Sequence, residues 1–188
     1  MFIYSMRVLG KCAQRIVEHY YVYKQFGIFL PQLSHIQSYQ NIVIGKNFSL
    51  SENCRLYCHD PDNGSVLEIG DNVTLNTGVS INSDCGGIIK IGNNVLIGPD
   101  VVIRASKHRI DDREKLVREQ GHVRGEIYIE DDVWLGAKVV VLQSVVIGKG
   151  SVIGAGSIVN SDIPPYSVAV GSPAIAIRYR CSNEDNQP

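Results

Sequence analysis

The 188-residue sequence has no excess of charge of either sign and no long basic block. Its 18 lysines and arginines nearly balance its 19 aspartates and glutamates, so the formal net charge is -1. Proteins that act mainly on nucleic acids or on anionic membranes usually present a strongly basic surface. The composition therefore argues against both as the main partner and favours a small molecule or a sugar.

The sequence also lacks a long apolar run. A membrane-spanning helix needs about 20 consecutive apolar residues, and no segment approaches that length. The stretch from Met1 to Gly10 is short and is interrupted by Arg7, which does not suit the apolar core of a signal peptide. We therefore expect a cytoplasmic protein without a membrane span.

No CxxC pair occurs, and the number of cysteines is odd. A disulfide framework would require paired cysteines, and a cysteine zinc site would require close spacing. The sequence therefore predicts reduced thiols and no metal held by cysteine. The five residues are Cys12, Cys54, Cys58, Cys85 and Cys181.

Apolar and charged residues alternate at roughly helical spacing between Arg7 and Lys24. This pattern predicts a short amphipathic helix within an N-terminal segment, residues 1–40. The helix either packs on the body of the protein or contacts a membrane or a partner. The pattern leaves both possibilities open.

The dominant feature is an aliphatic residue that returns every six positions, followed repeatedly by Gly or another small or polar residue, with a small residue at the fifth place. A single amphipathic helix would repeat every 3.6 residues, so short strands joined by tight corners are required. Three hexads close one coil of 18 residues, and the aliphatic positions stack inside. These positions are Ile44, Leu50, Leu56, Ile69, Leu75, Ile81, Ile91, Ile97, Ile103, Ile129, Leu135, Val141, Ile147, Ile153 and Val159.

The predicted fold is therefore an all-β parallel β-helix over residues 41–162, followed by a short C-terminal extension, residues 163–188. The repeat breaks between Ile103 and Ile129, where a polar insertion covers residues 104–126. A long loop on a rigid coil is a common place for functional groups. A smaller insertion, residues 58–65, has the composition of a turn, and we assign it no further role.

Several motifs together resemble the hexapeptide-repeat acyltransferases, in particular the sugar and xenobiotic O-acetyltransferases. The resemblance covers about residues 40–160 and implies a left-handed β-helix, a homotrimer with sites between subunits, and acetyl-CoA as the acyl donor. The motifs are IGPDVVI at 97–103, DVWLGA at 132–137, IGAGS at 153–157, DIPP at 162–165 and VGSPA at 170–174.

The resemblance implies that His108, which follows the coil ending at Ile103, is the general base. An imidazole suits this role at neutral pH, because an acceptor hydroxyl must lose its proton as it attacks the thioester. The implied oxyanion donor is the backbone N–H of Ala137. His122 is expected to be an ordinary loop residue, and His19 and His35 are expected to lie outside the coils. No serine or cysteine has an identifiable activating pair, so direct transfer is favoured over an acyl-enzyme.

The resemblance also implies that coenzyme A lies along a ridge of coil backbone. Trp134 follows the inward Val133, so it should point outward, as a wall of the site or as a subunit contact. Arg178 is implied to lie near the 3′-phosphate, or it is a solvated charge. Related proteins often carry Thr-Lys where this chain has Asn160-Ser161, so that lysine has no counterpart. The implied ridge residues are Gly136, Ala137, Ala155 and Asn160.

Asn82 and Asp84 stand where related enzymes bind the hydroxyls of a sugar, although ordinary turn residues would look the same. The predicted activity is acetyl transfer from acetyl-CoA to a carbohydrate hydroxyl, for example of a surface polysaccharide or its precursor. The alternatives are N-acylation of a nucleotide amino sugar, a carbonic anhydrase of the γ type with three histidines on zinc, and a noncatalytic β-helix.

Overall fold

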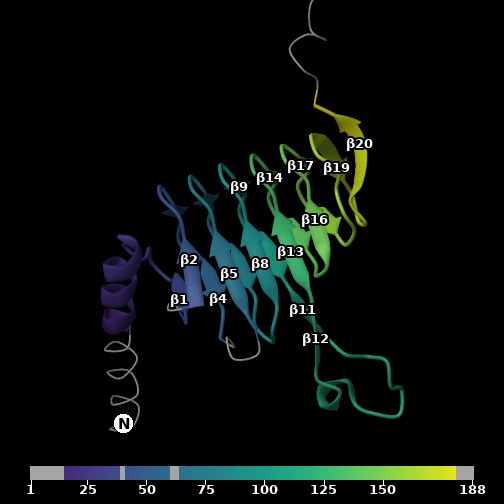
Figure 1. Cartoon of the computed structure of the whole chain (residues 1–188), viewed down its shortest axis with the longest axis horizontal. Coiled ribbons are helices and arrows are strands. Elements are labelled where there is room, and N and C mark those ends of the chain that lie inside the picture. The colour runs from purple at the N-terminus through teal and green to yellow at the C-terminus, as the bar shows by residue number, and fades with distance from the viewer. Residues whose placement is uncertain (1–14, 39–40, 60–63, 181–188) are drawn as a thin grey trace, which may run out of the picture.

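The computed structural model describes residues 15–38, 41–59 and 64–180. These form one short helix, residues 15–26, and a left-handed β-helix of about five turns, as the hexad repeat and the resemblance predict. In Figure 1 the helix stands at one end of the stack of coils and the C-terminal strands close the other end.

The coils form a three-sided prism, and we call its parallel sheets face A, face B and face C. The chain visits the faces in that order, so the corners are named A–B, B–C and C–A. Face A contains β1 (His35–Gln37), β4 (Arg55–Tyr57), β7 (Ser80–Asn82), β10 (Val102–Arg104), β15 (Val140–Val141) and β18 (Ile158–Val159). Face B contains β2 (Ile42–Ile44), β5 (Val66–Ile69), β8 (Ile88–Ile91), β13 (Glu126–Ile129) and β16 (Val145–Ile147). Face C contains β3 (Ser49–Leu50), β6 (Thr74–Leu75), β9 (Leu96–Ile97), β14 (Trp134–Leu135), β17 (Val152–Ile153), β19 (Ser167–Val170) and β20 (Ile175–Tyr179).

The six-residue repeat builds the core. From Leu56 to Val159 every predicted aliphatic position is buried, and the small residues at the fifth place are buried as well. Burial of each such aliphatic side chain contributes about 1.5–3 kcal/mol to the free energy of folding, relative to leaving it exposed. Ile44 and Leu50 are only half-buried but pack against this core, because they belong to the first coil, which has a neighbour on one side only.

The corners need residues that tolerate the left-handed backbone region. On the B–C corner Asn47, Asn72 and Asn94 have φ values of 56°, 57° and 58°. Asparagine adopts this conformation more readily than most residues. The three amides also form a ladder, since Asn47 donates to Asn72 at 2.9 Å and Asn72 donates to Asn94 at 3.0 Å.

The N-terminal helix packs against the first coil through Val22, which is fully buried, and Phe26. The backbone N–H of Ile36 donates to the Glu18 carboxylate at 2.9 Å. The predicted helix over residues 7–24 is thus observed from residue 15 onward, and residues 7–14 lie outside the described part. The expectation that His35 lies outside the coils is wrong, because it begins β1 and pairs with Arg55.

The C-terminal strands extend the stack. Strand β19 pairs in parallel with β17, and β20 returns antiparallel to β19. Parallel pairing therefore runs from His35 to Ala169 and is wider than the predicted residues 41–162. Arg180 binds the Asp132 carboxylate at 2.9 Å and the carbonyl of Gly150 at 2.7 Å, which holds the C-terminal end of β20 against the prism. No described helix is long and apolar enough to cross a membrane.

Candidate active site

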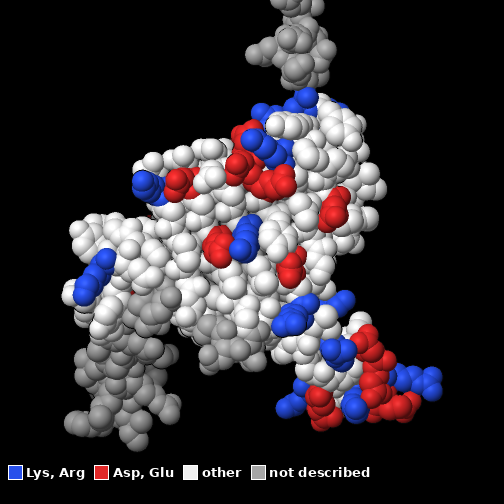
Figure 2. Space-filling model, viewed as in Figure 1, with Lys and Arg blue, Asp and Glu red and all other residues white. Residues whose placement is uncertain are grey.

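The predicted insertion is a β-hairpin rather than an irregular loop. Strands β11 (Ser106–His108) and β12 (His122–Arg124) pair antiparallel, and a short 3-10 helix, η3 (Val117–Glu119), lies between them. The hairpin leaves the A–B corner of the fourth coil and projects away from the prism (Figure 1). Figure 2 shows side chains of both charge signs gathered on it.

His108 and His122 face each other across this hairpin. They are directly paired in the strand register, with ring centroids 4.3 Å apart, and both side chains are exposed. His122 is thus a direct neighbour of the candidate base and not a remote loop residue. The pairing holds His108 three residues from the corner while its ring remains open to a ligand.

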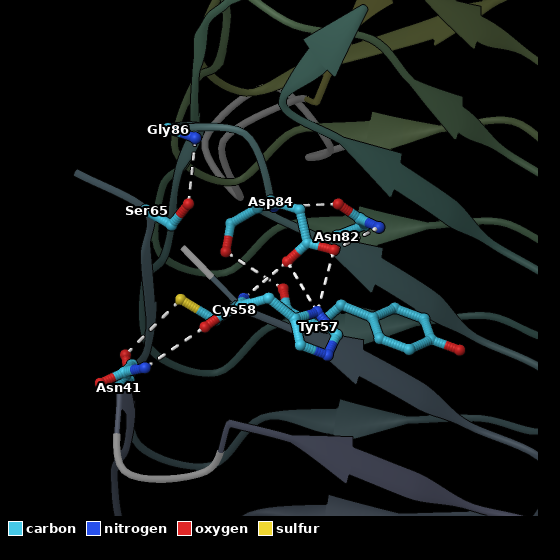
Figure 3. A network of polar contacts seen from close by, with 9 residues as sticks. Asn41, Tyr57, Cys58, Ser65, Asn82, Asp84 and Gly86 are labelled. Atoms are coloured by element: carbon cyan, nitrogen blue, oxygen red, sulfur yellow. Dashed lines mark hydrogen bonds and ion pairs between the residues drawn. The ribbon is translucent and has the colours of Figure 1, made fainter. Parts of the chain in front are cut away.

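A polar cluster lies at the same A–B corner, one and two coils closer to the N-terminus. The Asp84 backbone N–H donates to the Asn82 side chain at 2.9 Å, and the Asn82 amide donates to the Asp84 carboxylate at 3.3 Å (Figure 3). The same carboxylate accepts the backbone N–H of His59 at 2.7 Å and lies 3.1 Å from its ring Nδ1. The Tyr57 ring stacks on His59 with centroids 5.8 Å apart.

His59 was missed in the sequence because it lies in the short insertion at 58–65, which looks like a turn. The strand register is the signal that locates it: Tyr57 is directly opposite Asn82 in parallel strands, so the residues just after them share one corner. The length of the insertion hides this register when the hexads are counted. We call His59, Asn82 and Asp84 the corner cluster.

The root of the hairpin stacks directly on the corner cluster. The Ala105 backbone N–H donates to the Asn82 carbonyl at 3.1 Å, and the Gly125 N–H donates to the Ala105 carbonyl at 2.8 Å. A Cβ at Gly87 would lie 2.7 Å from the Ala105 Cβ, so this close approach requires glycine. Ser106, at the start of β11, is buried, and its hydroxyl has no hydrogen-bond partner among the described residues.

A second set of predicted residues lies on face C. Trp134 is 52% exposed on the outer surface, as predicted. In register with it follow Val152 on β17, Val168 on β19 and Arg178 on β20. Neighbouring strands are about 4.8 Å apart, so this row spans about 14 Å from Trp134 to Arg178. An apolar row that ends in a cation suits an extended chain that carries a phosphate.

Ala137 and Ala155 occupy the C–A corner on consecutive coils. Among the residues that the structure describes, neither backbone N–H has a hydrogen-bond acceptor, whereas the adjacent Gly136 N–H donates to the Ile153 carbonyl at 2.8 Å. A free N–H at a corner is available to a ligand amide or to an oxyanion. A Cβ at Gly136 would lie 2.7 Å from the Ala155 nitrogen, so glycine there is required for coil stacking.

The structure thus brings the predicted residues together in two groups. The first group, at the A–B corner, is His108 with the corner cluster. The second group lies on face C, with Trp134 and Arg178, and at the C–A corner, with Gly136, Ala137 and Ala155. Face A separates the two groups. Asn160 follows β18 and therefore lies at the A–B corner of the last coil, apart from the ridge of Gly136, Ala137 and Ala155.

Two further features bear on the chemistry. No group of three histidine, cysteine or acidic side chains in the described chain is placed to hold a metal ion, so the zinc trio of the carbonic anhydrase alternative has no counterpart there.

A hollow of about 690 Å³ lies over face B beside the hairpin root, lined in part by Arg124, Tyr128 and Asp162. Tyr128 donates to Glu126 at 2.7 Å, and this carboxylate raises the pKa of the Tyr128 hydroxyl.

Comparison with known proteins defines the class. Residues 126–161 match the family described as bacterial transferase hexapeptide (six repeats). A hexapeptide-repeat acetyltransferase from Vibrio cholerae shares 33% identity over 75% of this chain and 76% of that chain, with a TM-score of 0.64. The chain therefore belongs to the hexapeptide-repeat acetyltransferases and is an acyltransferase.

Two other solved structures are similar. A galactoside acetyltransferase in complex with coenzyme A shares 33% identity over 73% of this chain and 64% of that chain, with a TM-score of 0.55. An N-acyltransferase from Bacillus cereus, in complex with dTDP and 3-hydroxybutyryl-CoA, shares 20% identity over 79% of this chain and 77% of that chain, with a TM-score of 0.67. At that identity the second likeness shows the fold alone. Among curated protein sequences none matches the chain.

Proposed function

We propose that this protein transfers an acetyl group from acetyl-CoA to a hydroxyl of a carbohydrate acceptor, with His108 as the general base. The observation that carries the proposal is the position of His108 in a hairpin whose root stacks on the corner cluster through the 3.1 Å hydrogen bond from Ala105 to Asn82. Hydrogen-bonding groups for an acceptor and an exposed imidazole thus share one corner.

In the proposed reaction His108 takes the proton of the acceptor hydroxyl as its oxygen attacks the thioester carbonyl. The carbonyl oxygen becomes an oxyanion, and the free N–H of Ala137 donates a hydrogen bond to it. Collapse of the tetrahedral intermediate breaks the C–S bond, and the departing thiolate receives the proton from the His108 imidazolium. The products are the acetyl ester and free coenzyme A, so the base returns to its starting state.

The donor is proposed to lie along face C. Trp134 forms a wall beside the thioester, the free N–H of Ala137 faces the thioester carbonyl, the free N–H of Ala155 binds a pantetheine amide, and Arg178 binds the 3′-phosphate. Gly136 contributes by letting the coil of Ala137 stack closely on the coil of Ala155. Asn160 lies at the A–B corner and is not assigned to this row. The coenzyme A complex of the galactoside acetyltransferase supports this choice of donor.

Because face A separates the base from the proposed donor row, one subunit does not present a complete site. We propose a homotrimer in which the hairpin of one subunit reaches face C of the next. The projection of the hairpin away from its own prism supports this assembly (Figure 1). A cytoplasmic location follows from the need for acetyl-CoA.

The corner cluster is proposed to bind the acceptor. Asp84 accepts hydrogen bonds, Asn82 both donates and accepts, and the Tyr57 ring offers an apolar surface, which together suit a sugar. A galactoside offers hydroxyls rather than amines, and the likeness to a galactoside acetyltransferase at 33% identity favours the O-acetylation reading. A surface polysaccharide or its precursor fits this class.

The deciding experiment measures thiol release from acetyl-CoA with simple sugars, nucleotide amino sugars and lipid-linked glycans. We expect release with a hydroxyl acceptor and a product that mild hydroxylamine cleaves, because esters are labile and amides are not. A hydroxylamine-resistant product would identify an N-acyltransferase instead. If none of the acceptors on the panel leads to thiol release, the carbohydrate assignment is contradicted.

A further inference from the structure

The N-terminal helix is apolar on its outer side as well as its inner side. Val22 is fully buried against the first coil, yet Ile16, Val17 and Tyr20 are 71%, 51% and 59% exposed. A helix that only packs on the body of a protein presents polar residues to water on its outer face. The outer face therefore has the composition of a surface that meets something other than water.

The segment after the helix extends this surface. Phe29 is 77% exposed and stacks on Tyr23 with ring centroids 4.5 Å apart, and Leu33 is 58% exposed. We call Ile16, Val17, Tyr20, Phe29 and Leu33 the N-terminal patch. The patch contains three aliphatic and two aromatic residues, and its tyrosine combines an apolar ring with a polar tip.

Charge is segregated around this patch. Residues 1–33 contain four cations and one acid, which leaves 14 cations and 18 acids for the rest of the chain. The single acid, Glu18, points inward to the Ile36 N–H at 2.9 Å and the His35 ring at 3.4 Å. Within residues 15–38, 41–59 and 64–180 no acid forms an ion pair with Arg15 or Lys24. The patch therefore lies in a basic segment of an otherwise acidic protein.

We propose that the N-terminal patch docks this protein on an anionic membrane surface. Aromatic and aliphatic side chains beside cations, with the only acid turned inward, are the composition of helices that lie in a membrane interface. The acidic remainder of the chain is repelled by such a surface, which favours contact through this end. The near-neutral charge of the whole chain hides this segregation.

The docking surface is separate from the acetyl-transfer site. The patch lies on and after the helix at the first coil, whereas His108 extends from the fourth coil. Membrane docking therefore does not depend on the proposed acetyl transfer, and each is testable when the other fails.

The test is co-sedimentation of the full chain with vesicles of phosphatidylcholine alone and with about one third phosphatidylglycerol. We expect binding to the anionic vesicles, weaker binding to the neutral ones, and loss of the difference at high salt, because salt screens the charge attraction. Lys24→Glu reverses a charge and should weaken anionic binding about tenfold. The double variant I16D/Y20D should weaken binding to both kinds of vesicle.

Ile175→Asp is the matched control, since Ile175 is 63% exposed at the far end of the solenoid. It should bind vesicles like the parent. Circular dichroism and light scattering on every variant report folding and mass. The proposal is overturned by equal binding to neutral and anionic vesicles, by an equal loss in Ile175→Asp, or by a smaller mass for I16D/Y20D, which would mean that the patch joins copies of the chain.

Discussion

Among single side chains, His108 has the most specific predicted effect. A general base contributes about 10²- to 10⁴-fold in rate, so His108→Ala should lose that much kcat. Binding of coenzyme A and the melting temperature should be nearly unchanged, because the exposed ring lies outside the stacked coils. Steady-state kinetics with the identified acceptor, together with calorimetric titration of coenzyme A, measures this.

His122→Ala is the matched control for this prediction, since the centroids of the two imidazole rings are 4.3 Å apart. It should lose less activity than His108→Ala. His108 is not the general base if His122→Ala shows the larger loss at unchanged stability. The same holds if His108→Ala keeps more than about a tenth of parental activity.

Arg178 and Arg180 allow a paired comparison on one strand end. Arg178 has no ion pair within the described chain, whereas Arg180 binds Asp132 at 2.9 Å. Arg178→Ala should raise KM for acetyl-CoA more than it lowers kcat, because a remote phosphate contact is uniform binding. With dephospho-acetyl-CoA the variant and the parent should then behave alike.

Arg180→Ala should instead lower the melting temperature and leave KM for acetyl-CoA near its parental value. If removal of the 3′-phosphate affects Arg178→Ala as strongly as the parent, Arg178 is not the phosphate ligand. Thermal unfolding and kinetics on the same preparations separate the two roles.

The thiols offer a test of burial. Cys54 and Cys58 are buried, and burial raises the pKa of each thiol. Because the thiolate is the reactive form, a raised pKa slows modification at a given pH. In a Cys12→Ser/Cys181→Ser background, the half-buried Cys85 should react first with a thiol reagent near pH 8, and the other two should react only on unfolding. Three fast thiols would contradict the observed packing.

The sequence predicted single residues well where the hexad register is continuous. Buried Val133 and outward Trp134 follow directly from the six-residue period, since side chains alternate along a strand. The contact between His59 and Asp84 did not follow, because 25 residues and an insertion separate them. Side-chain contacts across a break of unknown length require coordinates.

Among the elements, the hairpin of β11 and β12 carries the clearest prediction. The Gly125 N–H donates to the Ala105 carbonyl at 2.8 Å, so the two ends of the insertion are already adjacent. Replacing residues 106–124 by a two-residue Asn-Gly turn should preserve the coil stack and its cooperative unfolding. Acetyl transfer should be abolished. Far-ultraviolet circular dichroism and the thiol-release assay measure the two outcomes, and an unfolded product would show that the hairpin supports the fold.

The sequence located this insertion but not its structure. Residues 104–126 have no regular apolar pattern, so a loop was the natural expectation. The hairpin is held by backbone pairing, which any sequence can supply once the two ends are fixed at one corner. The helix was predicted for the opposite reason, since apolar spacing reveals it, although the spacing did not show that its outer side is apolar too.

The assembly prediction concerns the molecule as a whole. If hairpin and donor row meet between subunits, light scattering should give three times the chain mass of 20.7 kDa. His108→Ala and Trp134→Ala trimers should each be nearly inactive. Hybrid trimers of the two should regain activity, because some interfaces then combine an intact hairpin with an intact face C. A monomeric mass, or no regain in hybrids, would contradict a shared site.

At this scale the repeat alone predicted the architecture, because every hexad supplies the same inward residue. Handedness followed from the resemblance and not from the spacing. The ends of the stack were missed by several residues, since β1 and β19 lack the full hexad pattern and are held in the sheets by their backbone pairing with β4 and β17.

The row from Trp134 to Arg178 also sets a fixed distance along the prism. Each step along it is one strand spacing of about 4.8 Å, so the separation between the indole and the guanidinium changes only in whole strands. No side-chain substitution adjusts it finely. In the proposed donor site, donor length would thus be selected in discrete increments, and a coil added or removed between these residues would shift the preference to a longer or shorter donor.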